Sequence, residues 1–137
     1  HQNNMQVDKK LYDAALKFLN KRFPNKTEDG GVAAMYTESG KILLSTYAES
    51  PNDGAGLCHE TGSICEAHKL NEKIAATICL SRAEGKVIVL PPCGICQERL
   101  AYWGQEISVA VPKKEDPTKY IVLKLSDIQP YYWGNYV

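Results

Sequence analysis

Residues 87–104, VIVLPPCGICQERLAYWG, change along their length from the pattern of a strand to that of a helix. Val87 to Leu90 is β-branched and apolar, which predicts a short strand, and Pro91-Pro92 ends it. Cys96 to Trp103 is predicted as a helix that ends at Gly104, because glycine is common just after the last helical turn. A strand that leads into a helix in this way favours an α/β fold.

Elements of the same two kinds lie on both sides of this stretch. Further strands are predicted at 31–37, 41–48, 74–81, 107–111 and 120–125, and further helices at 7–23, at 58–72 and from residue 125 onward. A turn at Glu84-Gly85 leaves 87–90 either as a separate short strand or as the continuation of the strand before it. Glu38-Ser39-Gly40, with glycine placed for positive φ, predicts a hairpin. The order indicates one domain, residues 5–137, with a mixed five-stranded sheet covered by helices on both faces.

Length, charge and cysteine content narrow the class of protein. The chain has 137 residues, which suits one domain, and its 16 basic and 16 acidic residues balance, so a nucleic-acid polymer is disfavoured as substrate. Its apolar runs are far shorter than the roughly 20 residues that cross a bilayer, so no membrane contact is predicted. His1 to Asn4 precede Met5 and look like the remnant of an expression tag. An odd count of five cysteines without a leader predicts a cytoplasmic protein with thiols or metal ligands instead of disulfides.

The pair Cys93 and Cys96 is the sharpest local feature. Two thiolates separated by two residues can both reach one tetrahedral zinc at about 2.3 Å. The same spacing at a helix start is also that of thioredoxin-type redox proteins, and two cysteines can simply be small core residues. A further ligand elsewhere in the chain is needed to decide for a metal.

Geometry selects that further ligand. The upstream candidates are Cys58, His59, Cys65, His68 and Cys79. In a helix that rises about 1.5 Å per residue, Cys65 lies roughly 10 Å and His68 roughly 15 Å beyond Cys58, too far to share its ion. Cys58 follows a glycine-rich loop at a predicted helix start, where free amides and the helix dipole favour a thiolate, and the same is expected of Cys96.

The remaining candidates have simpler explanations. Cys79 lies in an apolar strand and is expected to be buried packing, and His59 and His68 are expected to be surface or satisfied polar residues. We therefore predict that Cys58, together with the Cys93 and Cys96 pair, holds Zn²⁺.

Glu60 is the candidate proton carrier. It lies two residues after Cys58, in the predicted first helical turn, where side chains lean back toward the helix start and can face the open position of the metal. Taken alone, it could merely stabilise the helix N-terminus. A rival assignment pairs Cys65 with Glu66, but a mid-helix thiolate lacks free amides and Glu66 projects about 100° away.

Two segments together resemble a known signature. Cys58-His59-Glu60 and Pro92-Cys93-Gly94-Ile95-Cys96 resemble the zinc deaminases, in which His or Cys, any residue and Glu are followed by Pro-Cys-x-x-Cys. Residues 33–42 also look like the first hairpin of small cytidine deaminases, and the resemblance covers nearly all of the chain after the first four residues. It implies the three-layer α/β/α fold of the cytidine deaminase superfamily and a homotetramer or homodimer.

The resemblance also implies an activity. In the family, a metal-bound hydroxide attacks C4 of a cytosine-type small molecule, and the glutamate, here Glu60, protonates N3 and then the leaving amine. Glu49 matches a family glutamate that binds the sugar, and Tyr47 stands where nucleoside-specific members carry an asparagine for the ribose. Both are predicted substrate-binding residues.

Three departures concern the substrate and the metal. Besides Tyr47, Asp29 falls near the family's aromatic residue that packs on the base, and Thr61 replaces an arginine that in many three-cysteine members hydrogen-bonds the ligand sulfurs. The chain thus looks closer to the blasticidin S deaminase branch, whose substrate is a cytosine nucleoside antibiotic, than to a housekeeping cytidine deaminase.

Other functions stay open at this level. One is a non-catalytic zinc-stabilised binding domain of the same fold, and another is a thiol redox protein that uses Cys93 and Cys96. A polynucleotide editor is disfavoured because the sequence has no basic and aromatic stripe. The aromatic carboxyl end, residues 131–136, is expected to lie in a subunit interface or core, with lining of a base pocket in the same or a neighbouring subunit as the alternative.

Overall fold

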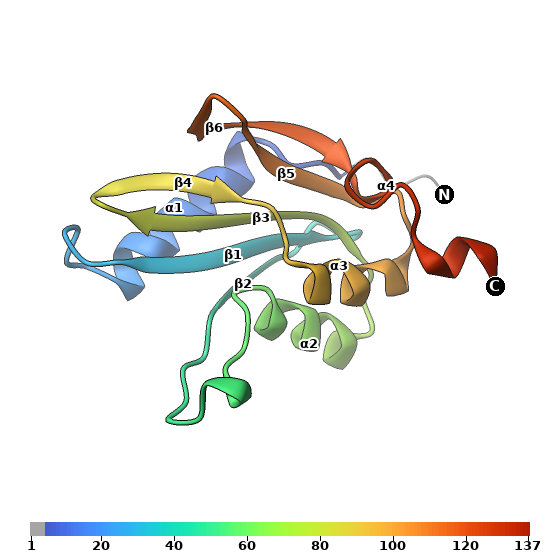
Figure 1. The fold of residues 1–137 in the computed structure, drawn as a ribbon, viewed down its shortest axis with the longest axis horizontal. Coiled ribbons are helices and arrows are strands. Elements are labelled where there is room, and N and C mark those ends of the chain that lie inside the picture. The colour runs from blue at the N-terminus through green and yellow to red at the C-terminus, as the bar shows by residue number, and fades with distance from the viewer. Residues whose placement is uncertain (1–4) are drawn as a thin grey trace.

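A mixed sheet of six strands forms the centre of the structure, a computed structural model that describes residues 5–137 (Figure 1). The strands are β1 (Gly30–Thr37), β2 (Ile42–Thr46), β3 (Ile74–Ala83), β4 (Lys86–Leu90), β5 (Ser108–Lys113) and β6 (Asp116–Lys124). The helices are α1 (Lys9–Arg22), α2 (Thr61–Leu70), α3 (Gly94–Leu100) and α4 (Leu125–Ile128), with short 3-10 helices η1 (Asp53–Ala55), η2 (Ala101–Trp103) and η3 (Trp133–Tyr136). The tag-like residues 1–4 lie outside the described residues.

Two strands, β4 and β5, share one edge of β3. The main order is β2-β1-β3-β5-β6, and β4 also pairs with β3. Because β1 runs along one edge of β3, the other edge is shared: β5 pairs in parallel at Ala76 and Thr77, and β4 pairs antiparallel from Cys79 to Ala83. The mixed sheet is confirmed, and residues 86–90 are a separate sixth strand. The chain leaves β4 after Leu90, which lies opposite Cys79.

Turn residues with positive φ fix two of the hairpins. Glu84 and Gly85, between β3 and β4, have φ angles of 53° and 76°, the pattern of a two-residue turn whose twist matches that of the strands. Gly40, between β1 and β2, has a φ angle of 93°, as expected for the predicted hairpin.

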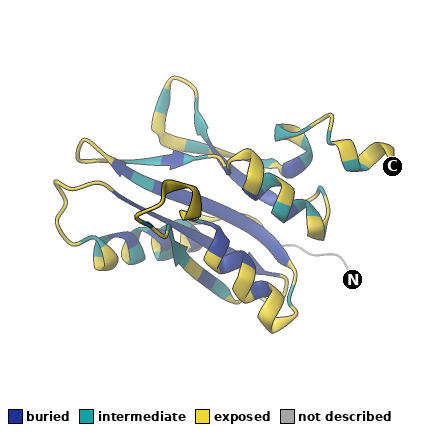
Figure 2. Cartoon of the chain, turned by 60° about the horizontal axis from the view of Figure 1, so that its bottom comes forward, coloured by how far each residue is buried: buried dark blue, intermediate teal, exposed yellow. Residues whose placement is uncertain are grey.

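Each face of the sheet has its own core. Side chains of β1 alternate between the two: Val32, Ala34 and Tyr36 pack on the side of α1, and Ala33 and Met35 pack on the side of α2 and α3. The helices contribute Leu11, Ala15 and Leu19 from α1, Ile64 and Ala67 from α2 and Leu100 from α3. Figure 2 shows the buried sheet between helices with one exposed side each. The predicted three-layer α/β/α arrangement is confirmed.

Three predicted helix starts differ from the observed ones, and the helix predicted from residue 7 begins at Lys9. The predicted helix 58–72 begins only at Thr61, because residues 58–60 form a turn in which the Thr61 N–H donates to the Cys58 carbonyl at 3.2 Å. The predicted helix from Cys96 begins already at Gly94 and has Cys93 as its N-cap. None of the described helices has the length and apolar character needed to cross a membrane.

Candidate active site

Two turns that precede helices bring three sulfurs together. Cys58 lies before α2, Cys93 is the N-cap of α3, and Cys96 lies in the first turn of α3. Their Sγ atoms all lie within 4.8 Å of one another, with 3.3 Å between those of Cys58 and Cys93. Ligands of one tetrahedral zinc, each about 2.3 Å from the ion, have nearly this mutual spacing. The donor set therefore fits Zn²⁺ with three thiolates and a fourth position for another group.

The three thiols differ in how readily they ionise. Burial opposes ionisation of Cys93, but the backbone N–H of Cys96, the Cys58 thiol and the backbone N–H of Ile95 outweigh it and lower the pKa of Cys93. Burial, followed by the charges of Glu60, Cys58 and Cys93, raises the pKa of Cys96 far above its ordinary value. The backbone N–H donors expected to lower the pKa of Cys58 and Cys96 thus act on Cys93 instead. Cys93 is the N-cap of α3, whereas Cys58 lies three residues before the start of α2.

Glu60 is buried beside this cluster, with 3% of its surface exposed. It occupies the N-cap position of α2, yet its side chain makes no capping hydrogen bond. Burial raises its pKa, although a backbone hydrogen bond and the Cys96 thiol act in the opposite direction. A carboxyl group that holds its proton more tightly than usual suits a proton carrier better than a helix cap.

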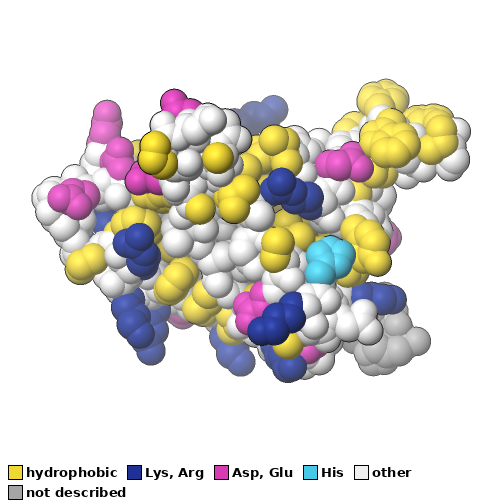
Figure 3. All heavy atoms as spheres, turned by 90° about the horizontal axis from the view of Figure 1, so that it is seen from below, with side chains coloured by type: hydrophobic (Ala, Val, Ile, Leu, Met, Phe, Trp, Pro, Cys, Tyr) yellow, Lys and Arg dark blue, Asp and Glu magenta, His cyan; other side chains and the backbone are white. Residues whose placement is uncertain are grey.

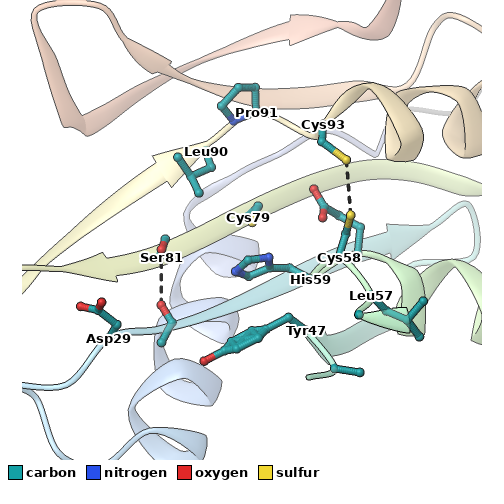
Figure 4. Close-up of a pocket in the computed structure, with 14 residues that line it drawn as sticks. Asp29, Tyr47, Leu57, Cys58, His59, Cys79, Ser81, Leu90, Pro91 and Cys93 are labelled. Carbon is teal, nitrogen blue, oxygen red and sulfur yellow. Dashed lines mark hydrogen bonds between the residues drawn. The ribbon is translucent and has the colours of Figure 1, made fainter. Parts of the chain in front are cut away.

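A pocket of about 640 Å³ opens next to the sulfurs (Figure 4). Cys58 and Cys93 lie at one end of it and Asp29 at the other. The lining also includes Gly30, Tyr47, Ala48, Gly56, Leu57, His59, Glu60, Cys79, Ser81, Leu90 and Pro91. No lysine or arginine of residues 5–137 belongs to this lining, so the charged groups that face the pocket are acidic.

Aromatic rings form one wall of the pocket. The Tyr47 ring stacks on Phe23, with ring centroids 5.7 Å apart, and also contacts the His59 imidazole, with centroids 5.1 Å apart and a tilted geometry. Burial lowers the pKa of His59, which keeps the ring neutral. Gly31 makes room for this ring, because a Cβ at that position would run into the imidazole.

Comparison with solved structures shows which known proteins share this fold. The structure superimposes on the crystal structure of the cytidine deaminase from Bacillus anthracis with a TM-score of 0.84 and 39% sequence identity, covering 92% of this chain and 89% of that chain. The chain belongs to the cytidine deaminase family.

More distant members of the family share the fold. Cytidine deaminase from Mycobacterium tuberculosis is 23% identical with a TM-score of 0.68, covering 92% of this chain and 97% of that one. The enzyme from Burkholderia pseudomallei is 21% identical with a TM-score of 0.67, covering 90% and 96%. A scan against protein-family models found no match, and a search of curated proteins found none either. The predicted superfamily is confirmed, and the blasticidin S branch stays a prediction.

The predicted substrate-binding residues of this cytidine deaminase family member have different surroundings. Tyr47 lies on the pocket wall, and so does Asp29. Glu49 is exposed and is not among the described residues that line the pocket, so its predicted contact with a sugar stays a prediction.

The other cysteine and histidine candidates divide into two groups. Cys65 is exposed, and His68 is away from the pocket, between the rings of Tyr102 and Trp103 at 4.9 and 4.7 Å. Cys79 is buried as expected but also lines the pocket, within 4.8 Å of Glu60 and His59. The apolar sequence of its strand did not indicate that Cys79 also lines the pocket.

Sequence reasoning also missed Arg99. Its Nη1 donates to Thr61 Oγ1 at 2.9 Å and to Cys96 Sγ at 3.9 Å. The spacing of three residues from Cys96, which places both side chains on the same face of a helix, was the signal available in the sequence.

Proposed function

We propose that this protein is a zinc-dependent hydrolytic deaminase of a cytosine-type ring. The observation that carries the proposal is the convergence of three cysteine sulfurs with the buried Glu60 carboxyl at one end of a pocket. The pocket volume of about 640 Å³ lies in the range that accommodates a small molecule. Membership of the cytidine deaminase family and 39% identity to the Bacillus anthracis enzyme support the same activity.

Cys58, Cys93 and Cys96 would hold the metal. When bound, Zn²⁺ supplies Lewis acidity that makes water nucleophilic at neutral pH. The lowered pKa of Cys93 favours the thiolate that binds zinc, because thiolates and not thiols are ligands.

Glu60 would move two protons. As the oxygen of water bonds to C4 of the ring, the carboxylate takes a proton from that water and delivers it to N3. The carboxyl group then passes the remaining proton of the new C4 hydroxyl to the amine, the C4–N bond breaks and ammonia leaves. Burial of Glu60 and its raised pKa suit this work, because the group must hold each proton briefly before it passes it on.

The pocket lining selects the charge of the substrate. Tyr47 and His59 offer flat rings against which a heterocycle can pack, and Asp29 adds a negative group at the far end. Since no described lining residue is basic, a phosphorylated ring would bring its negative charge against acidic groups. We therefore propose an uncharged or cationic substrate: cytidine, deoxycytidine or, as the second candidate favoured by Asp29, a cationic cytosine nucleoside of the blasticidin S type.

A direct assay tests this function. The zinc-loaded protein is incubated separately with cytidine, deoxycytidine, blasticidin S and cytidine monophosphate, and released ammonia is measured. We expect release from one or more of the first three and much slower release from the monophosphate. Stoichiometric zinc without ammonia from any compound would instead favour the non-catalytic binding domain.

We also propose a cytoplasmic homo-oligomer, a tetramer or a dimer. The support is a set of exposed apolar side chains, seen in Figure 3 on the face of α2 and α3 and at the projecting C-terminal end. They include Ile95, Tyr102, Tyr131, Trp133 and Tyr136, each at least 60% exposed in the single chain. Sedimentation of the purified protein tests this state.

A further inference from the structure

A guanidinium group lies beside the most buried of the three sulfurs. Arg99 is on α3, one turn after Cys96, and its Nη1 lies 3.9 Å from Cys96 Sγ. The same nitrogen donates to the hydroxyl of Thr61, the first residue of α2, at 2.9 Å. Cys96 has no exposed surface and Thr61 only 8%, while Arg99 is half-buried, so the contact is partly shielded from water. One cation therefore joins the start of α2 to a sulfur on α3.

The negative charges at this site would be stabilised by a nearby cation. Three thiolates around one Zn²⁺ leave a net charge near minus one, and the buried carboxyl of Glu60 lies against the same cluster. Buried like charges repel strongly because little water screens them. Within residues 5–137, no lysine and no other arginine donates a hydrogen bond to any of the three sulfurs. Arg99 is thus the cation that the structure supplies to the cluster.

We propose that Arg99 is a positioning residue that offsets the charge of the thiolate cluster and so retains the metal. Its Nη1 donates to Cys96 Sγ at 3.9 Å, and a hydrogen bond from a cation to a negatively charged metal ligand is stronger than one between neutral groups. Thr61 Oγ1 accepts a second hydrogen bond from the same nitrogen. The inference rests on the metal site of the proposed function and adds to it the residue that governs metal affinity.

A purely structural tie between α2 and α3 makes a different prediction. If Arg99 only joined the two helices, loss of the Thr61 hydroxyl would be as harmful as loss of the guanidinium. If the positive charge acts on the sulfur, Thr61→Val removes one hydrogen bond but leaves the cation in place. The two substitutions therefore separate the two roles.

Zinc affinity is the measurement. Purified proteins are titrated with a chromophoric chelator that competes for the metal, and the zinc dissociation constant is compared among wild type, Arg99→Gln and Thr61→Val. Lys69→Gln, which removes an exposed cation of α2, is the matched control. We expect Arg99→Gln to weaken zinc binding roughly 10-fold to 100-fold, as is common for groups that support a metal ligand, with Thr61→Val and the control close to wild type.

A double variant tests whether weaker zinc binding in Arg99→Gln comes from loss of the charge or from a folding defect. The double variant Thr61→Arg with Arg99→Gln places a guanidinium on α2 beside the same sulfur and is expected to recover most of the zinc affinity. Wild-type affinity in Arg99→Gln, an equal loss in Thr61→Val, or no recovery in the double variant would overturn the inference and leave the proposed function standing. Wild-type protein that binds no zinc would overturn the proposed metal site itself.

Discussion

The Sγ atoms of Cys58 and Cys93 lie 3.3 Å apart although 35 positions separate these residues in the chain. Hydrogen bonds to the backbone hold the two turns that carry them. Ser45 Oγ, on β2, donates to the carbonyl of His59 at 2.7 Å, and Gln97 Nε2 donates to the carbonyl of Pro92 at 2.8 Å. The sulfurs thus meet because the sheet and α3 fix the backbone next to each of them.

Loss of one of these sulfurs should remove the metal. Cys93→Ser replaces a thiolate of lowered pKa with a hydroxyl, which is a poor zinc ligand, so we expect zinc content well below one ion per chain. Elemental analysis after dialysis against a chelator measures this. Cys65→Ser is the control, because Cys65 is exposed on α2 and outside the cluster. Equal zinc in both variants would contradict the ligand set.

Glu60→Gln should separate chemistry from binding. The amide cannot carry a proton, so we expect kcat to fall by a factor of about 10² to 10⁴, while zinc stays bound. The measurement is steady-state deamination of whichever substrate the wild type uses, together with zinc content. Glu66→Gln, an exposed change on the same helix, serves as the control. Full activity in Glu60→Gln would remove this residue from the mechanism.

Arg82 should be a strong contributor to stability. It is 2% exposed, and its guanidinium donates to the carbonyls of Phe23, Asn25 and Glu28 and to the Asn20 side chain. Arg82→Met would leave these acceptors without their donor, at a cost of roughly 3 kcal/mol in the free energy of unfolding.

Denaturant unfolding measures the cost of losing Arg82. Lys21→Met, at an exposed site on α1, should change the free energy of unfolding little. If both variants unfolded at the same denaturant concentration, Arg82 would not be holding the 23–28 loop.

Glu72 should make stability depend on acid pH. The Lys41 ammonium, 2.8 Å from Glu72 Oε2, together with the hydroxyls of Ser39 and Thr37, lowers the pKa of Glu72 from 4.5 to about 2. A depressed folded-state pKa adds stability above the unfolded-state value, and this stability is lost as pH falls from 4.5 toward about 2.

A comparison of variants isolates the contribution of Glu72. The difference in unfolding free energy between wild type and Glu72→Gln should be larger at about pH 6 than at about pH 3, because part of the stability that the ionised Glu72 adds is already lost at the lower pH. A difference that stays constant over this range would show that the ion pair with Lys41 contributes nothing measurable.

Much of the fold could be predicted because its signals are local. The alternation of β1 between two cores and the positive φ at Gly40 follow from short-range patterns. The start of α2 could not be placed, because the turn at residues 58–60 depends on Ser45, which lies on another element.

The clustering of the three cysteines could be predicted from their motif, whereas their role as metal ligands stays a prediction. The spacing of Cys58, Cys93 and Cys96 indicated a metal cluster, and the structure brings their sulfurs together. The contact of Arg99 with Thr61 and the tilted contact of the Tyr47 ring with His59 join elements that are distant in sequence, and no local periodicity encodes them.

The most direct test of the proposed reaction follows the oxygen atom. The zinc-loaded protein is incubated with cytidine, deoxycytidine or blasticidin S in water enriched in a heavy oxygen isotope, and the product is analysed by mass spectrometry. The proposed reaction predicts a ring that has lost its amine and gained one heavy oxygen, in wild type and not in Glu60→Gln. Unchanged substrates in the presence of bound zinc, or a product without the heavy oxygen, would contradict hydrolytic deamination at this site.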